Sequence, residues 1–161
     1  MVSLSPSQNY LVASAKHISG TYYIKIFENQ DGNLTEFLGP WPIEAPTSFQ
    51  GIAINETLGG MSGDPTSIQG RIYCSFGNNN PNSDKHLYIY DFTGEMLEHH
   101  IHIIGKDWAT SINPDMYEPE GLAFKGSRLY IGIVSGTSGN RQKALFPVKT
   151  KIRPKQQQQI T

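Results

Sequence analysis

The chain has 161 residues, which suggests one domain, and its 13 basic and 14 acidic residues almost cancel. Without an excess of either charge, the composition predicts no attraction to nucleic acid and none to an anionic membrane. No apolar run approaches the roughly 20 residues that span a bilayer, and residues 1–10 lack the charged and apolar regions of a signal peptide.

The residue types predict an all-β protein. Sixteen glycines and ten prolines supply frequent turns, and eight tyrosines with seven phenylalanines favour strands. The single cysteine, Cys74, cannot form a disulfide within the chain, so it does not indicate a compartment.

The N-terminal third begins with a polar leader, residues 1–9. Runs rich in β-branched and aromatic residues follow at Tyr10–Ala15, Tyr22–Phe27 and Leu34–Leu38. Asp31 and Gly32 predict a tight hairpin turn before the last run, because glycine readily takes a positive φ. Residues 10–42 therefore predict three strands of one antiparallel sheet.

The middle third, residues 49–104, predicts a complete four-stranded unit. Its strand-like runs are Gln50–Ile54, Arg71–Phe76, His86–Phe92 and Glu95–Ile104. The third run is apolar on both faces, with Leu87 and Ile89 on one face and with Tyr88, Tyr90 and Phe92 on the other. A strand of this kind is expected between two packed layers.

The C-terminal third repeats a phrase of the middle third. Gln50-Gly51-Ile52-Ala53-Ile54 and Arg71-Ile72-Tyr73 match Glu120-Gly121-Leu122-Ala123-Phe124 and Arg128-Leu129-Tyr130. Such self-similarity is typical of repeat architectures. Residues 119–148 therefore predict strands one to three of a further unit, and residues 149–161, rich in glutamine, predict a low-complexity tail.

The repeat predicts a partial β-propeller-like array of four-stranded antiparallel blades, over residues 10–148. Propellers close with roughly four to eight blades, whereas the predicted strands form fewer than three complete blades. An open array would leave wide apolar faces in water. We therefore expect completing blades, either from a longer parent chain or by self-association.

Glu120 is the first candidate site residue, because it stands just before an innermost strand, beside the central channel of a propeller. Its carboxylate would bind Ca²⁺ or anchor a sugar or phosphate. Alternatively it would cap a turn or pair with Arg128. Gln50 at the equivalent position favours this structural interpretation, since an amide serves the same hydrogen bonding.

The loop entering the C-terminal unit is the second candidate. It combines aromatic, amide and acidic side chains, in Trp108, Asn113, Asp115 and Tyr117. An aromatic ring beside such groups would stack on a carbohydrate while the polar groups bond its hydroxyls; a solvated turn-rich loop has the same composition. Arg141, in the Gly- and Ser-rich loop 135–141, would meet an anion. That loop and the asparagine-rich loop 78–82 also fit ordinary hairpin connections.

Histidines gather in the strand predicted at the outer edge of the middle unit. Glu98, His100 and His102 alternate onto one face, where two imidazoles and a carboxylate would suit a metal. Polar residues in an edge strand also prevent pairing with other sheets, and the spacing is not a zinc signature.

The repeated phrase around Gln50 and Glu120 resembles the propellers of phage receptor-binding proteins, teichoic-acid-associated proteins and helveticin-type bacteriocins. This resemblance implies a non-catalytic module that binds a bacterial surface polysaccharide or glycopolymer, in an extracellular or virion-associated setting. The phrase is also similar to phytase-like esterase and lactonase propellers, which implies a catalytic Ca²⁺ at Glu120, although Gln50 departs from that pattern. A protein-interaction scaffold is a third alternative.

Overall fold

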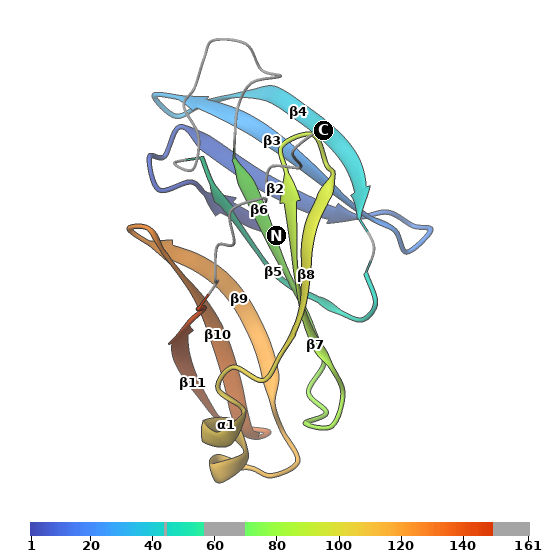
Figure 1. Cartoon of the computed structure of the whole chain (residues 1–161), viewed down its shortest axis with the longest axis vertical. Helices are drawn as coiled ribbons and strands as arrows, with labels where there is room; N and C mark the ends of the chain where they lie inside the picture. Colours follow the sequence, from blue (N-terminus) through green and yellow to red (C-terminus); the bar gives the residue numbers. More distant parts are fainter. Residues whose placement is uncertain (44, 57–69, 150–161) are drawn as a thin grey trace, which may run out of the picture.

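The computed structural model describes residues 1–43, 45–56 and 70–149, which form three antiparallel sheets and one short helix (Figure 1). The all-β prediction is confirmed. Residues 150–161, all but the first residue of the predicted tail, lie outside the described residues. So do residues 57–69, between the first two predicted strands of the middle unit.

The first sheet contains four strands in chain order, and it forms the upper layer in Figure 1. These strands are β1 (Val2–Leu4), β2 (Tyr10–Lys16), β3 (Tyr22–Gln30) and β4 (Asn33–Ile43). The short β1 lies within the segment expected to be a polar leader and pairs with β2, with Leu4 opposite Leu11. Three residues are too few for a periodic pattern, so the sequence did not indicate this strand.

The middle sheet contains β5 (Phe49–Asn55), β6 (Arg71–Phe76), β7 (Lys85–Asp91) and β8 (Met96–His102), again in chain order. Helix α1 (Lys106–Ile112) connects it to the last sheet, which contains β9 (Glu118–Lys125), β10 (Arg128–Thr137) and β11 (Asn140–Pro147). The seven residues of α1, the one helix among the described residues, are far too few to cross a membrane. The hydroxyl of Ser135 in β10 donates to the carbonyl of Ala109, which holds the helix against the last sheet.

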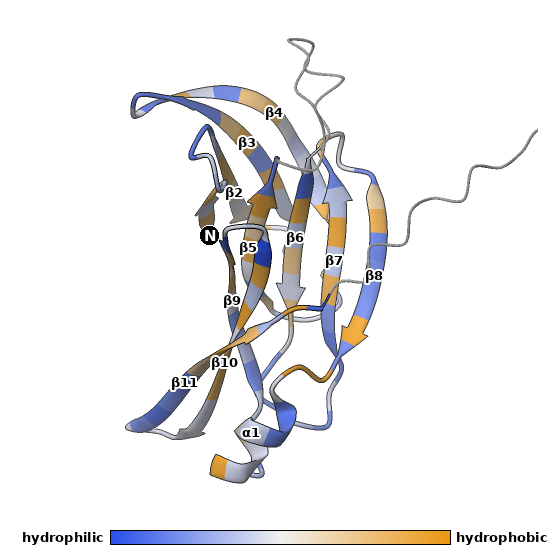
Figure 2. Cartoon of the chain, turned by 60° about the vertical axis from the view of Figure 1, so that its left-hand side comes forward, coloured by the Kyte–Doolittle hydropathy of each residue, from blue (hydrophilic) through white to orange (hydrophobic). Residues whose placement is uncertain are grey.

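The middle sheet lies between the other two and is buried on both faces. Tyr88, Tyr90 and Phe92 pack in one apolar cluster with Val12 and Ile26 of the first sheet. In contrast, Leu87 and Ile89 pack in a second cluster with residues of the last sheet, among them Leu122, Ile131 and Ile133. The predicted division of this strand between two layers is confirmed. Edge strand β8 is hydrophilic from Glu98 to His102 except at Ile101 (Figure 2).

The repeated phrase forms the meeting point of the middle and last sheets. A Cβ atom on Gly51 of β5 would lie 2.6 Å from the Cα of Gly121 in β9, so the two backbones touch there. Only a glycine allows this approach without displacement of a strand. At Gly121 itself a Cβ would meet nothing within 4 Å, and its φ of 109° favours glycine instead, so the two glycines of the phrase have different structural causes.

The residue before each of these glycines belongs to a β-bulge. Phe49 pairs with Phe76 and Gly51 with Ser75, which leaves Gln50 as an extra residue. Similarly, the pairing of β9 with β10 shifts around Glu120 and Gly121, which together oppose Gly132. Bulges redirect side chains and are frequent next to functional sites. Gln50 and Glu120 therefore occupy equivalent backbone positions, as their alignment predicted.

Candidate functional site

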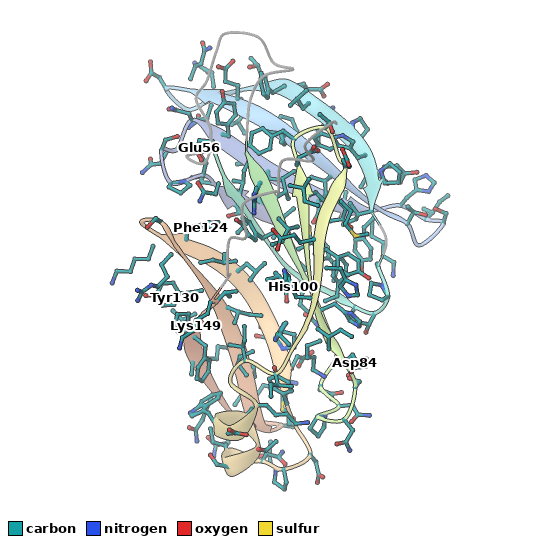
Figure 3. The ribbon with its side chains drawn as sticks, in the orientation of Figure 1. Glu56, Asp84, His100, Phe124, Tyr130 and Lys149 are labelled. Carbon is teal, nitrogen blue, oxygen red and sulfur yellow. The ribbon has the colours of Figure 1, made fainter. Side chains whose placement is uncertain are left out.

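Two loops meet at the lower end of the molecule in Figure 1, below β7 and beside α1. One is the asparagine-rich connection between β6 and β7, residues 77–84, and the other joins α1 to β9, residues 113–117. The backbone N–H of Tyr117 donates to the carbonyl oxygen of Asn79 at 2.9 Å, which ties the loops together. Asp84 marks this end in Figure 3.

The asparagine-rich loop is braced by its own side chains. The Oδ1 atom of Asn78 accepts the backbone N–H of Asn80 at 3.0 Å, and that of Asn80 accepts the N–H of Asn82 at 2.9 Å. The hydroxyl of Ser83 donates to Asn78 as well. These contacts are the local side-chain to backbone bonds that asparagine and serine favour in turns.

Lys85 holds the same loop from the inside. Its residue is 1% exposed, and its ammonium donates to the carbonyls of Asn80 at 2.7 Å and Ser83 at 2.8 Å, and to the Ser83 hydroxyl at 2.8 Å. The ammonium also lies 5.1 Å from the centre of the Tyr117 ring. Burial lowers the pKa of Lys85, with a further contribution from Lys106. Three acceptors and an aromatic face nevertheless satisfy all three of its N–H groups.

Three polar side chains point outward from this braced framework. Asn79, Asn82 and Asp115 are exposed, and none of them forms a side-chain hydrogen bond within the described residues. We call these three residues the asparagine rim. Their groups are available to a ligand, while the backbone that carries them is fixed. Only Asp115 was among the site residues predicted from sequence. The amides of loop 78–82 were not predicted as site residues, because their composition also fits an ordinary hairpin loop.

The other residues predicted for carbohydrate binding have mainly structural contacts. Tyr117 is buried, its hydroxyl donates to the carbonyl of Ile104 at 2.9 Å, and burial raises its pKa strongly. Its ring therefore cannot stack on a sugar. Asn113 donates to the carbonyl of Gly136 at 2.8 Å and accepts the N–H of Asp115. Trp108 is half-buried against Phe146, with ring centres 5.7 Å apart.

Glu120 and Arg141 are brought together by the structure, on the face of the last sheet that points away from the middle sheet. The Glu120 carboxylate lies 3.2 Å from the ammonium of Lys143 and 3.7 Å from the guanidinium of Arg141. It pairs with these residues of β11 rather than with Arg128. Gln50 instead donates to the carbonyl of Gly77 at 3.0 Å and to the Glu118 carboxylate at 3.2 Å. The two bulge residues thus do not form one site.

Two cations beside Glu120 do not favour calcium at its carboxylate, because like charges repel. The described residues contain no group of three or more His, Cys, Asp and Glu side chains arranged to hold a metal. Among the described His, Cys, Asp and Glu side chains, none therefore joins Glu120 in a set of several Ca²⁺ ligands.

Substitution of Glu120 with glutamine should change the free energy of unfolding by less than about 1 kcal/mol, because exposed ion pairs contribute little. Addition of Ca²⁺ should leave the thermal midpoint of both proteins unchanged. Thermal unfolding with and without Ca²⁺ checks this result. A rise in the midpoint of the parent protein that Glu120→Gln abolishes would establish a calcium site, since a ligand of the folded state stabilises it.

The histidines of β7 and β8 separate into three places. His100 lies 2.8 Å from Glu98, which also binds Arg71 at 3.1 Å. His86 and His99 face one another, with 2.9 Å between Nδ1 and Nε2. The predicted convergence of Glu98, His100 and His102 is absent among the described residues.

His102 lies apart from the others, in the interior near the rim. Its Nδ1 atom is 3.5 Å from the Tyr117 hydroxyl and accepts the backbone N–H of Ile104 at 3.4 Å. Burial is the main reason that its pKa falls to about 4, and His86 and Lys85 contribute to the decrease. His102 is therefore neutral near pH 7.

The structure thus defines an all-β protein of repeated antiparallel sheets with a braced, amide-rich loop pair at one end. Comparison with protein-family models, with curated proteins and with solved structures gives no match.

Proposed function

We propose that the chain is a non-catalytic recognition module, built from β-propeller-type blades, that binds a bacterial cell-surface glycan or glycopolymer through the asparagine rim. In this proposal the module acts outside the cell or on a virion, as the resemblance of its repeated phrase implies. It rests on two groups of observations, one on the architecture and one on the rim.

The order of the sheets supports the propeller-type architecture. Every sheet runs in chain order from its first strand, and the first strands of neighbouring sheets touch: β5 contacts β1 on one side and β9 on the other. Equivalent bulges at Gln50 and Glu120 mark the same position in two sheets. This order is the one expected of blades around a central channel, which supports the proposal. The three sheets alone do not close into a ring.

The main observation in support of a glycan ligand is the braced pair of loops with its exposed polar side chains. Amide groups both donate and accept hydrogen bonds, and a carboxylate accepts them, so Asn79, Asn82 and Asp115 match the hydroxyl groups of a sugar. Because Lys85 and Tyr117 already hold the backbone, binding would cost little ordering of the loop. The nearly neutral chain suits a ligand recognised by hydrogen bonds rather than by net charge.

The double substitution Asn79→Ala with Asn82→Ala should weaken binding of purified wall glycopolymer on the order of tenfold to a hundredfold. Each lost hydrogen bond accounts for about 0.5–1.5 kcal/mol. Binding is measured by calorimetry, after a glycan array has identified the polymer. The matched control is Asn33→Ala, an exposed asparagine in the β3–β4 hairpin, which should bind like the parent.

Equal binding by the double variant and the parent would exclude the rim as the site. Absence of any bound polymer on the array would contradict the proposed ligand class. Trp108→Ala provides a second comparison: because the indole packs against Phe146, its loss should lower stability more than polymer affinity.

A further inference from the structure

One cross-strand pair occurs in both the middle and the last sheet, but within the described part of the chain it is covered only in the middle sheet. Ala53 pairs with Tyr73 between β5 and β6, and both are buried against the last sheet, where the Tyr73 ring meets Phe124 with 5.3 Å between ring centres. The equivalent pair is Ala123 with Tyr130, between β9 and β10. In this second copy Ala123 is exposed and Tyr130 is half-exposed.

This second pair belongs to an open face of the last sheet, which also carries the ion pairs of Glu120 with Arg141 and Lys143. Tyr130 alternates with Leu129 and Ile131, which are buried toward the middle sheet, so it points to the other side. Figure 3 shows Tyr130 on the side of the sheet away from the middle sheet. Leu145 of β11 lies on the same side, opposite Gly132, and is 72% exposed. We call Ala123, Tyr130 and Leu145 the trailing face.

The first sheet also has an open face, on which apolar residues lie beside the ion pair of Lys25 with Glu36. Val2 and Leu4 of β1 are exposed, Leu4 at 49%, and Leu4 pairs with Leu11, which pairs with Phe27. This face is opposite the one that carries Val12 and Ile26 toward the middle sheet. We call Val2, Leu4, Leu11 and Phe27 the leading face.

The packing inside the chain shows which kinds of face fit together. The middle sheet places its Ala53–Tyr73 face against the last sheet and its opposite face against the first sheet. The trailing face repeats the Ala–Tyr pair of the middle-sheet face that packs on the last sheet. The leading face is equivalent to the middle-sheet face that packs on the first sheet. One chain therefore presents, on its two outer sheets, both kinds of face that pack together between its own neighbouring sheets.

We infer that the partner of these faces is a second copy of this chain, with the trailing face of each copy on the leading face of the other. This inference rests on the propeller-type architecture proposed above. A contact between two different faces of the same molecule is heterologous, and it forms a closed ring when the rotation permits. Two copies with three sheets each provide six sheets, within the roughly four to eight blades that close a propeller.

The test compares the mass of the whole chain in solution with that of variants in each face. Leu145→Glu alters the trailing face and Leu4→Lys alters the leading face; both side chains are exposed, so both variants should fold, as circular dichroism will check. Light scattering after size exclusion should give twice the chain mass for the parent and a single chain mass for each variant. The control Ile18→Glu, at a fully exposed turn residue, should keep the parent mass.

An equimolar mixture of the two variants separates head-to-tail contact from other dimers. The mixture should regain twice the chain mass, because one interface is unaltered and the other faces the new carboxylate with the new ammonium. A monomeric parent, a dimer that survives Leu145→Glu, or a mixture that stays monomeric would each overturn the inference. Polymer binding by a monomeric parent would overturn this inference alone, whereas a dimer that binds no polymer would contradict only the proposed ligand.

Discussion

Replacement of Gly51 with alanine should lower the free energy of unfolding by about 3 kcal/mol, the upper part of the range for insertion of an atom into a packed interior. The new Cβ would lie 2.6 Å from the Cα of Gly121 and 2.8 Å from the backbone nitrogen of Leu122. Both neighbours are backbone atoms, so no side chain can rotate away. Relief requires separation of the middle and last sheets, which uncovers the cluster that contains Ile131 and Ile133.

Urea denaturation of matched glycine variants measures this effect. Gly126→Ala is the control, because its Cβ would meet open space while its φ of 59° costs a side chain about 1 kcal/mol. We expect Gly51→Ala to be clearly the less stable of the two variants, with a similar dependence on urea concentration. Equal midpoints would mean that β5 and β9 do not touch at these glycines.

Acidification should destabilise the chain by about 3 kcal/mol as the pH falls from about 6.5 to about 4, because His102 remains neutral in the folded state. The pKa of a histidine in the unfolded chain is about 6.5, and that of His102 in the fold is about 4. Between these values the unfolded chain binds more protons, so stability rises with pH in this window. Each unit of difference between the two pKa values corresponds to about 1.36 kcal/mol of folding free energy. Burial also lowers the pKa of His86, which acts in the same direction.

The free energy of unfolding, measured by urea denaturation at a series of pH values, tests this dependence. His102→Gln should reduce the slope between pH 6.5 and pH 4, since the titrating group near Tyr117 and Lys85 is removed. His17→Gln, at an exposed turn residue, should retain the slope of the parent. An unchanged slope in His102→Gln would show that this imidazole is not buried as a neutral group.

The sequence predicted the features of the fold that depend on local pattern. The apolar residues on both faces of β7 predicted its place between two layers, because strand side chains alternate strictly. The strands β2 and β3 were recognised by residue type and by their turns. In contrast, β1 and α1 were not predicted. Each is short, and each is held by tertiary contacts, such as the pairing of Leu4 with Leu11 and the bond from Ser135 to the helix.

The candidate site was less predictable, because residue type does not determine burial. Tyr117 has the composition of a sugar platform but lies in the interior, where its hydroxyl is bonded to Ile104. Pairing with Arg128 was one alternative that the sequence left open for Glu120, whereas the register of β10 with β11 places Arg141 and Lys143 beside it. Partners of this kind follow from strand pairing across a hairpin and not from distance along the chain.

By itself the sequence determined that the chain is all-β and repeats a unit, because alternation and self-similarity are visible in residue order. Only the tertiary structure decided which structural role each repeated residue has. Gly51 leaves room for the backbone of Gly121, and Gly121 adopts a positive φ. Gln50 and Glu120 are bulge residues with different partners. It also decided which polar groups are free, because Lys85 and Tyr117 hold the loops from which Asn79, Asn82 and Asp115 project. Exposure and contact depend on the packing of distant segments, which no local pattern specifies.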